Sequence, residues 1–257
     1  MADLTKKIKD FMSKGNLLVS KSEEHQKMSD EILRAAKELL WCDVFKDTIK
    51  GYDWYREKSL SLGRWAIGYN YAYVLVRVLN ELRPQSILEC GLGQSSKIIE
   101  DYVVFEKNVR YDIVEQDQNW VNFFERDYGF TQRTCVHIRN IVETEFCPKG
   151  GIGSKTYVYE NFDGIVEGKK YELISIDGPW GGDIYSRVDV LNHIPAILAD
   201  DFVIMTDDFE RVGEQNMVKL LKEKLDCNNI PYYEGRYDGM KDICILVSEK
   251  WRFFTTM

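Results

Sequence analysis

One short segment, Ser86 to Ser96, constrains the fold of this chain more than any other. A short apolar strand leads into Glu89, a turn with two glycines (Gly91 and Gly93) follows, and two serines then open a helix. Glycines let a backbone turn tightly and approach a ligand closely, and a helix N-terminus presents free N–H groups. A carboxylate at Glu89 would repel a pyrophosphate. We therefore expect a ligand that carries a cation or hydroxyl groups.

Length and composition exclude several classes of protein. The chain has 257 residues, enough for one large α/β domain with an appendage. A net charge of −8 argues against broad nucleic-acid binding. No apolar run approaches the roughly 20 residues that a membrane span needs, and the first residues lack the apolar core of a signal peptide. Six cysteines occur without a C-x-x-C pair. We expect a cytoplasmic protein with free thiols.

The first third of the chain, residues 1–82, is predicted to be a helical extension or lid. Apolar residues recur at helical spacing near its start, and again after a plausible cap at Ser29. A third helix is expected from Trp65 to Leu82, ended by Pro84. The aromatic stretch before it could pack inward or cover a substrate. The apolar stripes of these helices suit either a homo-oligomer or packing on the chain's own sheet.

From residue 83 to 257 the pattern alternates between strands and helices. This order predicts a doubly wound, mostly parallel α/β sheet that ends in an antiparallel strand pair. The insertion at residues 141–170 is predicted to be a loop or small hairpin, and residues 188–199 a helix. The expected strands are Ser86–Cys90, Arg110–Glu115, Thr134–Ile138, Glu172–Asp177, Phe202–Thr206, Pro231–Tyr237 and Ile243–Val247.

Acidic residues stand at the carboxyl ends of four of these strands, where open α/β sheets bind their ligands. They are Glu89, Glu115, Asp177 and the pair Asp207-Asp208. The carboxylate of Glu115 can accept hydrogen bonds from both hydroxyls of a ribose, or it can cap the helix that follows. At this point Glu115 could serve either role, and a ribose could belong to more than one class of ligand.

One combination of features occurs between Pro84 and Val247: Glu89, the glycine turn, Glu115 and Ile176-Asp177-Gly178. This combination resembles the class I S-adenosylmethionine-dependent methyltransferases. The resemblance implies a Rossmann-like fold with S-adenosylmethionine as cofactor. It places the two glycines under the methionine part of the cofactor, Glu89 near its amino group and Glu115 at its ribose. The residues assigned to the cofactor site are Glu89, Gly91, Gly93, Ser95, Ser96, Glu115 and Gln116.

The second half carries a narrower resemblance. The segments Glu172–Gly182 and Val203–Arg211 are similar to the glucuronoxylan O-methyltransferases of plants and to sugar O-methyltransferases of antibiotic pathways. The resemblance implies a hydroxyl on a sugar or polysaccharide precursor as the acceptor. It also implies a divalent cation such as Mg²⁺ on Asp177, Asp207 and Asp208. This chain has Pro179-Trp180 where the antibiotic family has a further acid.

Methyl transfer to oxygen requires removal of the acceptor's proton, for which a carboxylate or a histidine is suited. The candidate catalytic residues are Asp177, Asp208 and His193. Each has a structural alternative: a histidine is more often packed or exposed, and an aspartate can cap a turn. Arg187 and Arg211 flank the acidic motifs and could bind an acidic substrate or form ordinary salt bridges.

Three functions follow from these residues. The first is an S-adenosylmethionine-dependent O-methyltransferase that acts on a sugar hydroxyl, with or without a metal. The second is an NAD-dependent oxidoreductase, because Glu115 could also bind the ribose of NAD. The third is a nucleotide-binding module that has kept the fold and lost the chemistry.

Overall fold

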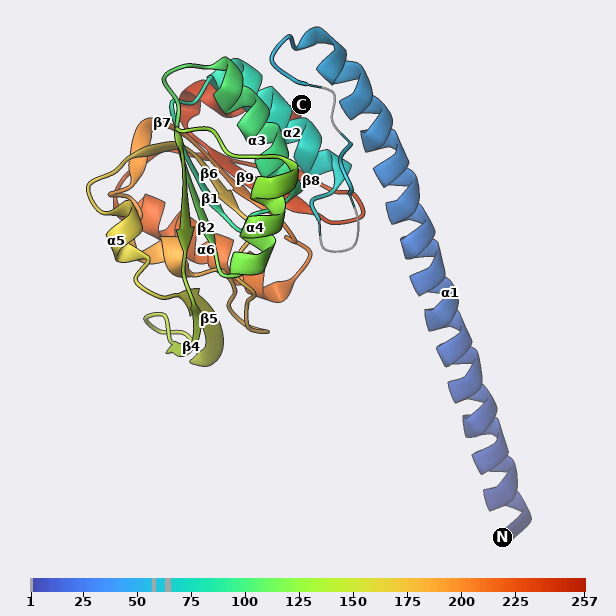
Figure 1. Ribbon diagram of the computed structural model, residues 1–257. Coiled ribbons are helices and arrows are strands. Elements are labelled where there is room, and N and C mark those ends of the chain that lie inside the picture. The colour runs from blue at the N-terminus through green and yellow to red at the C-terminus, as the bar shows by residue number, and fades with distance from the viewer. Residues whose placement is uncertain (1, 57–58, 63–65) are drawn as a thin grey trace.

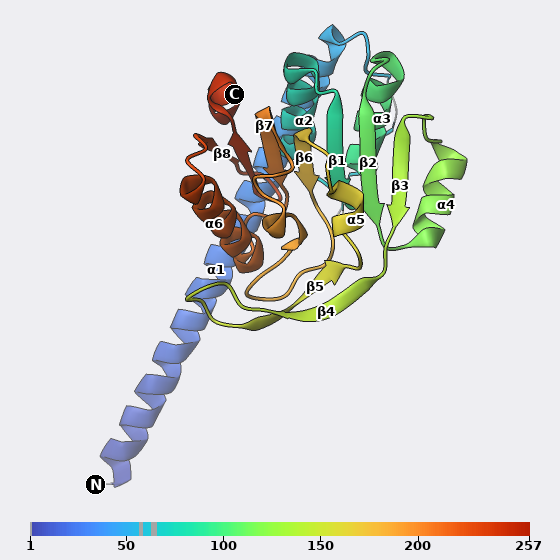
Figure 2. The same cartoon turned by 90° about the vertical axis from the view of Figure 1, so that its left-hand side faces the viewer.

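The structure, a computed structural model, describes residues 2–56, 59–62 and 66–257, with side chains in the first helix from residue 23 onward. Its centre is a seven-stranded sheet in the order β3-β2-β1-β6-β7-β9-β8, seen in Figure 2. β9 runs in the direction opposite to the other six strands of this sheet. The strands are β1 (Ser86–Cys90), β2 (Arg110–Glu115), β3 (Thr134–Ile138), β6 (Tyr171–Ile176), β7 (Leu198–Thr206), β8 (Tyr233–Tyr237) and β9 (Ile243–Val247).

Helices cover both faces of the sheet and create two apolar cores. Successive strand residues point to opposite faces, so Ile87 belongs to one core and Leu88 to the other. The first core packs α2 (Tyr69–Leu82), α3 (Gln94–Phe105), α4 (Gln118–Asp127) and the C-terminal 3₁₀ segment η3 (Glu249–Thr256) against the sheet. The second contains α5 (Asp163–Val166) and α6 (Val212–Cys227). The domain boundary at residue 82 remains a prediction, and α2, just before it, is buried in the first core.

The predicted fold class, a doubly wound and mostly parallel sheet with an antiparallel C-terminal pair, is confirmed. Four strands begin and end where the sequence predicts: β1, β2, β3 and β9. The insertion at residues 141–170 contains a hairpin of β4 (Ile141–Phe146) and β5 (Ser154–Tyr159). Because the parallel strands are in register, their carboxyl ends meet at one edge of the sheet.

The N-terminal segment differs from the prediction. A single helix, α1 (Ala2–Thr48), runs past Ser29 without a break and projects far from the body (Figure 1). The predicted cap at Ser29 is wrong because residues 22–48 contain neither glycine nor proline to end the helix. The predicted start of the third helix at Trp65 lies outside the described residues, and the observed helix there is α2. Among the described helices, none combines the length and apolarity that a membrane crossing requires.

The predicted helix at residues 188–199 is also wrong. A short 3₁₀ turn, η2 (Asp189–Asn192), stands there, and β7 already begins at Leu198. Pro195 explains the difference, because it has no N–H to donate and its ring excludes the backbone of a preceding helical turn. The segment is therefore too short to form the helix that its apolar spacing suggests.

The turn between β8 and β9 is held by both N-terminal helices. The buried side chain of Asn70 in α2 donates hydrogen bonds to the carbonyls of Tyr237 (2.9 Å) and Lys241 (2.8 Å). From α1, Arg34 pairs with Asp242 at 3.0 Å. Since β8 runs parallel to the central strands, this turn lies at the same carboxyl edge as the acidic residues.

Candidate active site

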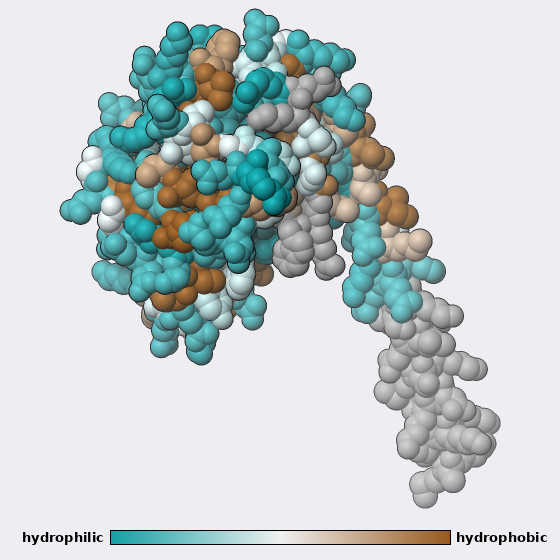
Figure 3. All heavy atoms as spheres, viewed as in Figure 1, coloured by the Kyte–Doolittle hydropathy of each residue, from teal (hydrophilic) through white to brown (hydrophobic). Residues whose placement is uncertain are grey.

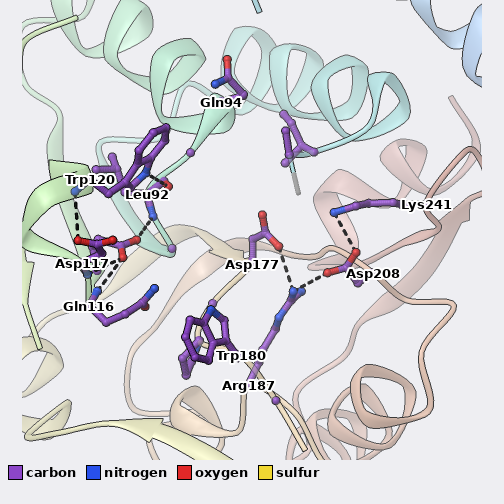
Figure 4. Close-up of a pocket in the computed structure, with 18 of the residues that line it drawn as sticks. Leu92, Gln94, Gln116, Asp117, Trp120, Asp177, Trp180, Arg187, Asp208 and Lys241 are labelled. Carbon is purple, nitrogen blue, oxygen red and sulfur yellow. Dashed lines mark hydrogen bonds and ion pairs between the residues drawn. The ribbon is translucent and has the colours of Figure 1, made fainter. Parts of the chain in front are cut away.

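A pocket of about 810 Å³ opens at the carboxyl edge of the sheet, within the usual size range of small-molecule sites. Figure 4 shows that it has two sides, with Asp177 between them. One side is formed by the β1–α3 turn and the end of β2. The other is formed by the ends of β6 and β7 and the β8–β9 turn. Residues from the segment before α2 border it as well: Ser61, Ala66 and Ile67.

The two glycines of the β1–α3 turn contribute differently. Gly91 has a φ of +97°, and a Cβ there would lie 3.2 Å from the backbone of Asp177 and Gly178. Glycine is therefore required for the turn to pack against the end of β6. A Cβ on Gly93, by contrast, would meet no described atom within 4 Å, although Gly93 lines the pocket. The space above Gly93 is open to a ligand.

Glu115 lines the same side of the pocket at the end of β2. Its carboxylate accepts hydrogen bonds from three backbone amides, those of Leu92 (2.8 Å), Gln116 (2.8 Å) and Asp117 (2.9 Å). Burial raises the pKa of Glu115 above its usual value, against the effect of these donors. The helix cap of α4 is Asp117, not Glu115. Glu115 thus ties the glycine turn to β2, and it borders the pocket.

Gln116 and Trp120 complete this side. Gln116 lines the pocket, and its side-chain oxygen is screened from water without a hydrogen-bond partner in the described part of the chain. Buried polar atoms are rarely left unpaired, so this oxygen is available to a ligand. Trp120 donates its indole N–H to the carbonyl of Leu92 at 2.8 Å and stacks on Phe123. It forms a fixed apolar wall.

Glu89 lies beneath the pocket and does not line it. The carboxylate is fully buried and accepts hydrogen bonds from Ser96 at 2.6 Å and from Tyr111. The Ser96 hydroxyl in turn accepts a hydrogen bond from the backbone amide of Gly93 at 2.9 Å. Burial raises the pKa of Glu89 to about 7. In this structure Glu89, with Ser95 and Ser96, supports the glycine turn from below.

The opposite side of the pocket is organised around Arg187. Its Nη2 lies 3.0 Å from Asp177 Oδ1 and 2.6 Å from Asp208 Oδ2, as Figure 4 shows. The guanidinium is almost fully buried and also donates to the carbonyl of Asp207 at 2.9 Å. Burial alone would lower the pKa of Arg187, but the carboxylates around it raise it. Arg187 is therefore a permanent charge that links the ends of β6 and β7.

Lys241, from the β8–β9 turn, completes this cluster. Its Nζ lies 3.1 Å from Asp207 Oδ2 and 2.9 Å from Asp208 Oδ1. Burial raises the pKa of Asp207 to about 8. Asp208 is also desolvated, yet Arg187 and Lys241 hold its pKa below the usual value. Arg211 adds a contact to Asp208 at 3.0 Å.

The predicted metal ligands do come together, but the residues around them do not fit a metal. One carboxylate oxygen from each of Asp177, Asp207 and Asp208 lies within 4.8 Å of the others. These carboxylates are already paired with Arg187 and Lys241, and Arg187 Nη2 stands between two of them. Asp207 is wholly buried and does not line the pocket. Cationic side chains occupy the position that the resemblance gives to the ion.

His193 lies away from this pocket. It follows η2, its ring packs on Phe162, and its Nε2 lies 2.9 Å from the exposed Asp163. It is not among the residues that line the pocket. The structure therefore does not bring the candidate base His193 together with Asp177 and Asp208.

Lys241 is the functional candidate that the sequence reasoning missed. The residues between the last two strands were expected to be only a turn. The signal was the strand order: an antiparallel final pair after a parallel sheet returns its turn to the carboxyl edge. Trp180, also in the pocket lining, is 68% exposed and presents a free indole face beside the acidic cluster.

No protein-family model and no curated protein sequence matches the chain. Solved structures match its fold. TomG, an O-methyltransferase from Streptomyces achromogenes in complex with S-adenosylmethionine, has a TM-score of 0.52 at 10% identity, over 82% of this chain and 98% of that one. An O-methyltransferase from Bacillus cereus in complex with S-adenosylhomocysteine has a TM-score of 0.51 at 9% identity, over 85% of this chain and 100% of the other. The chain therefore has the fold of these O-methyltransferases.

The raised pKa of Glu89 makes stability depend on pH. A pKa of about 7 in the folded protein, against the ordinary value of 4.5, means that the protonated acid favours folding and that this advantage disappears as pH rises through about 7. Relative to Glu89→Gln, the wild-type free energy of unfolding should fall by about 3 kcal/mol between pH 4 and 8. Urea denaturation across this range measures the difference.

Glu249→Gln, at an exposed position, is the matched control. Its difference from wild type, measured over the same range, is the baseline for the comparison. A Glu89→Gln difference that changes with pH no more than this baseline would contradict the assignment of a buried, protonated Glu89.

Proposed function

We propose that this protein is an S-adenosylmethionine-dependent O-methyltransferase that acts on a hydroxyl of a neutral, sugar-like acceptor. The observation that carries the proposal is the position of Asp177. In Figure 4 its carboxylate lies between Leu92 of the glycine turn and the charged cluster of Arg187, Asp208 and Lys241, and its side chain is 20% exposed. A donor on one side and a hydroxyl on the other would meet beside this acid.

The first side of the pocket supports S-adenosylmethionine as the cofactor. When bound, the cofactor supplies a methyl group on a positively charged sulfur. Asp117, Glu115 and Asp177 line the pocket, and carboxylates favour a ligand with positive charge over a pyrophosphate. Glu115 can accept from ribose hydroxyls, and Gln116 has a free carbonyl oxygen for a further donor. The same carboxylates argue against NAD.

The proposed chemistry uses Asp177 as the general base. The acceptor hydroxyl would donate a hydrogen bond to the oxygen of Asp177 that does not face Arg187. Its proton would pass to this carboxylate as the acceptor's O–CH3 bond forms and the S–CH3 bond of the donor breaks, leaving a neutral thioether. Burial raises the pKa of Asp177 above its usual value, which strengthens it as a base. Arg187 holds the carboxylate in place from the other side. Asp208 is paired with Arg187 and Lys241 and acts as their anchor.

A neutral acceptor agrees with the charges of the second side. Arg187, Arg211 and Lys241 all contact carboxylates of the cluster, so each of these cations already has a partner and gives an anionic acceptor little to bind. Trp180 provides an exposed apolar face, and the charged groups provide donors and acceptors for hydroxyls. A sugar ring combines these two kinds of surface.

Ligand binding tests the cofactor assignment. Titration calorimetry should detect binding of S-adenosylhomocysteine and should detect no binding of NAD. A Cβ at Gly93 meets no described atom within 4 Å, so the side chain of Gly93→Val should project into the open space and lower the affinity for S-adenosylhomocysteine by about tenfold or more. Thermal unfolding checks that the variant is as stable as wild type. Gly51→Val is the control, because a Cβ there also meets no described atom within 4 Å and Gly51 is outside the pocket lining. Tight NAD binding would refute the proposal.

Substitution of the base tests the chemistry. Methyl transfer from labelled S-adenosylmethionine should be found with neutral glycosides and not with uronic acids. On the best acceptor, Asp177→Asn should lower kcat by about 10²–10⁴-fold and leave S-adenosylhomocysteine affinity near that of wild type. Wild-type kcat should decline as pH falls through the raised pKa of Asp177. His193→Gln should keep full activity, and retention of activity by Asp177→Asn would show that another group removes the proton.

Chelation tests whether the cationic side chains of Arg187 and Lys241 stand in place of a metal ion. Because Arg187 and Lys241 pair with the acids that would bind an ion, EDTA should leave methyl transfer unchanged, and titration with MgCl₂ should give no binding heat. Loss of activity with EDTA and its return with Mg²⁺ would restore the metal hypothesis.

A further inference from the structure

The long helix α1 presents two different faces. Its inner face packs on the body through aromatic and charged side chains: Trp41 donates to the carbonyl of Asp238 at 2.7 Å, and Phe45 is buried in the first core. At 100° per residue, the opposite face carries large apolar side chains. Between 42% and 73% of each is exposed: Met28, Ile32, Leu33, Leu39, Leu40 and Val44. Figure 3 shows apolar side chains along the side of α1 turned away from the body.

The sequence of this outer face is symmetric about Ala36. Reversing a second copy of the helix about that residue sets Met28 opposite Val44, Ile32 opposite Leu40, and Leu33 opposite Leu39. Ala36 would then face its own copy, and a small residue at the crossing point allows two helices to approach closely. Every exposed apolar side chain of the face thus meets an apolar one.

The polar residues at the two ends of this face also match in the reversed arrangement. His25 falls opposite Asp47, and Ser29 falls opposite Asp43, which gives each carboxylate a donor. A parallel pair would instead bring Asp43 against Asp43 and Asp47 against Asp47, and such like-charge pairs are destabilising. Charge therefore selects the antiparallel arrangement.

We propose that the occupant of this face is a second copy of the chain, bound through an antiparallel α1–α1 pair with two-fold symmetry. Such a face is complementary to itself, as a two-fold interface requires. The inner faces, which pack on the two bodies, would point away from each other in such a pair. The proposal does not depend on which reaction the pocket carries out.

Sedimentation velocity over a concentration series tests the proposal with the full chain. Wild type should be a dimer at micromolar concentration. Leu39→Glu should raise the dimer dissociation constant by about 100-fold or more, because each copy would bury an unpaired charge. Val104→Glu, at a 45% exposed apolar position on the body, should not change it. Thermal unfolding and circular dichroism check that each variant is folded.

Charge reversal tests the direction of pairing. Asp47→Lys places a cation opposite His25 and should weaken the dimer by about tenfold. Adding His25→Glu should restore it, because the pair is reformed with exchanged charges. In a parallel dimer the two positions are far apart, and no restoration would follow. A monomer at all concentrations, a dimer insensitive to Leu39→Glu, or a failure of the double variant to recover would each overturn the proposal.

Discussion

The site depends on the ion pairs that Arg187 makes at the carboxyl edge of the sheet. A parallel sheet collects its strand ends at one edge, and Asp207 and Asp208 at the end of β7 are almost fully buried there. Arg187 and Asp208 both have backbone φ values in the left-handed region, 54° and 57°, where a residue with a side chain pays about 1–2 kcal/mol. The pairing accounts for this strain, because a carboxylate left buried without its partner would cost about 3–5 kcal/mol.

The cluster also explains how distant parts of the chain reach one site. Lys241 contacts Asp207 and Asp208 from a turn that Asn70 holds by hydrogen bonds to its carbonyls. Glu38 of α1 accepts the amides of both Tyr69 and Met240 and so joins α1, α2 and this turn. The N-terminal helices are therefore part of the support for the pocket. A shift of α1 would therefore be passed to Asp207 and Asp208 through the β8–β9 turn that carries Lys241.

The sequence was informative where local pattern decides the outcome. Apolar runs that end in an acid identify buried strands, and parallel topology then requires those acids to share an edge; the ends of β1, β2, β6 and β7 follow from this reasoning. It was less informative where the outcome depends on a partner remote in sequence. The hydrogen bonding of the buried Glu89 carboxylate depends on Tyr111 in β2. The cation between Asp177 and Asp208 depends on the path of the loop that carries Arg187, and residue spacing does not encode that path.

The two faces of α1 connect the proposed pairing with the proposed chemistry. On the inner face, Arg34 and Glu38 hold the turn that carries Lys241. In the proposed pair, the outer face fixes the same helix against its copy, and a helix packed on both sides bends and shifts less than one packed on a single side. Lys241 helps to set the pKa of Asp208. A less mobile α1 would therefore hold the charges near the proposed base, Asp177, in a more constant position. Helix pairing would thus act on the site through packing alone, without any residue of the partner entering the pocket.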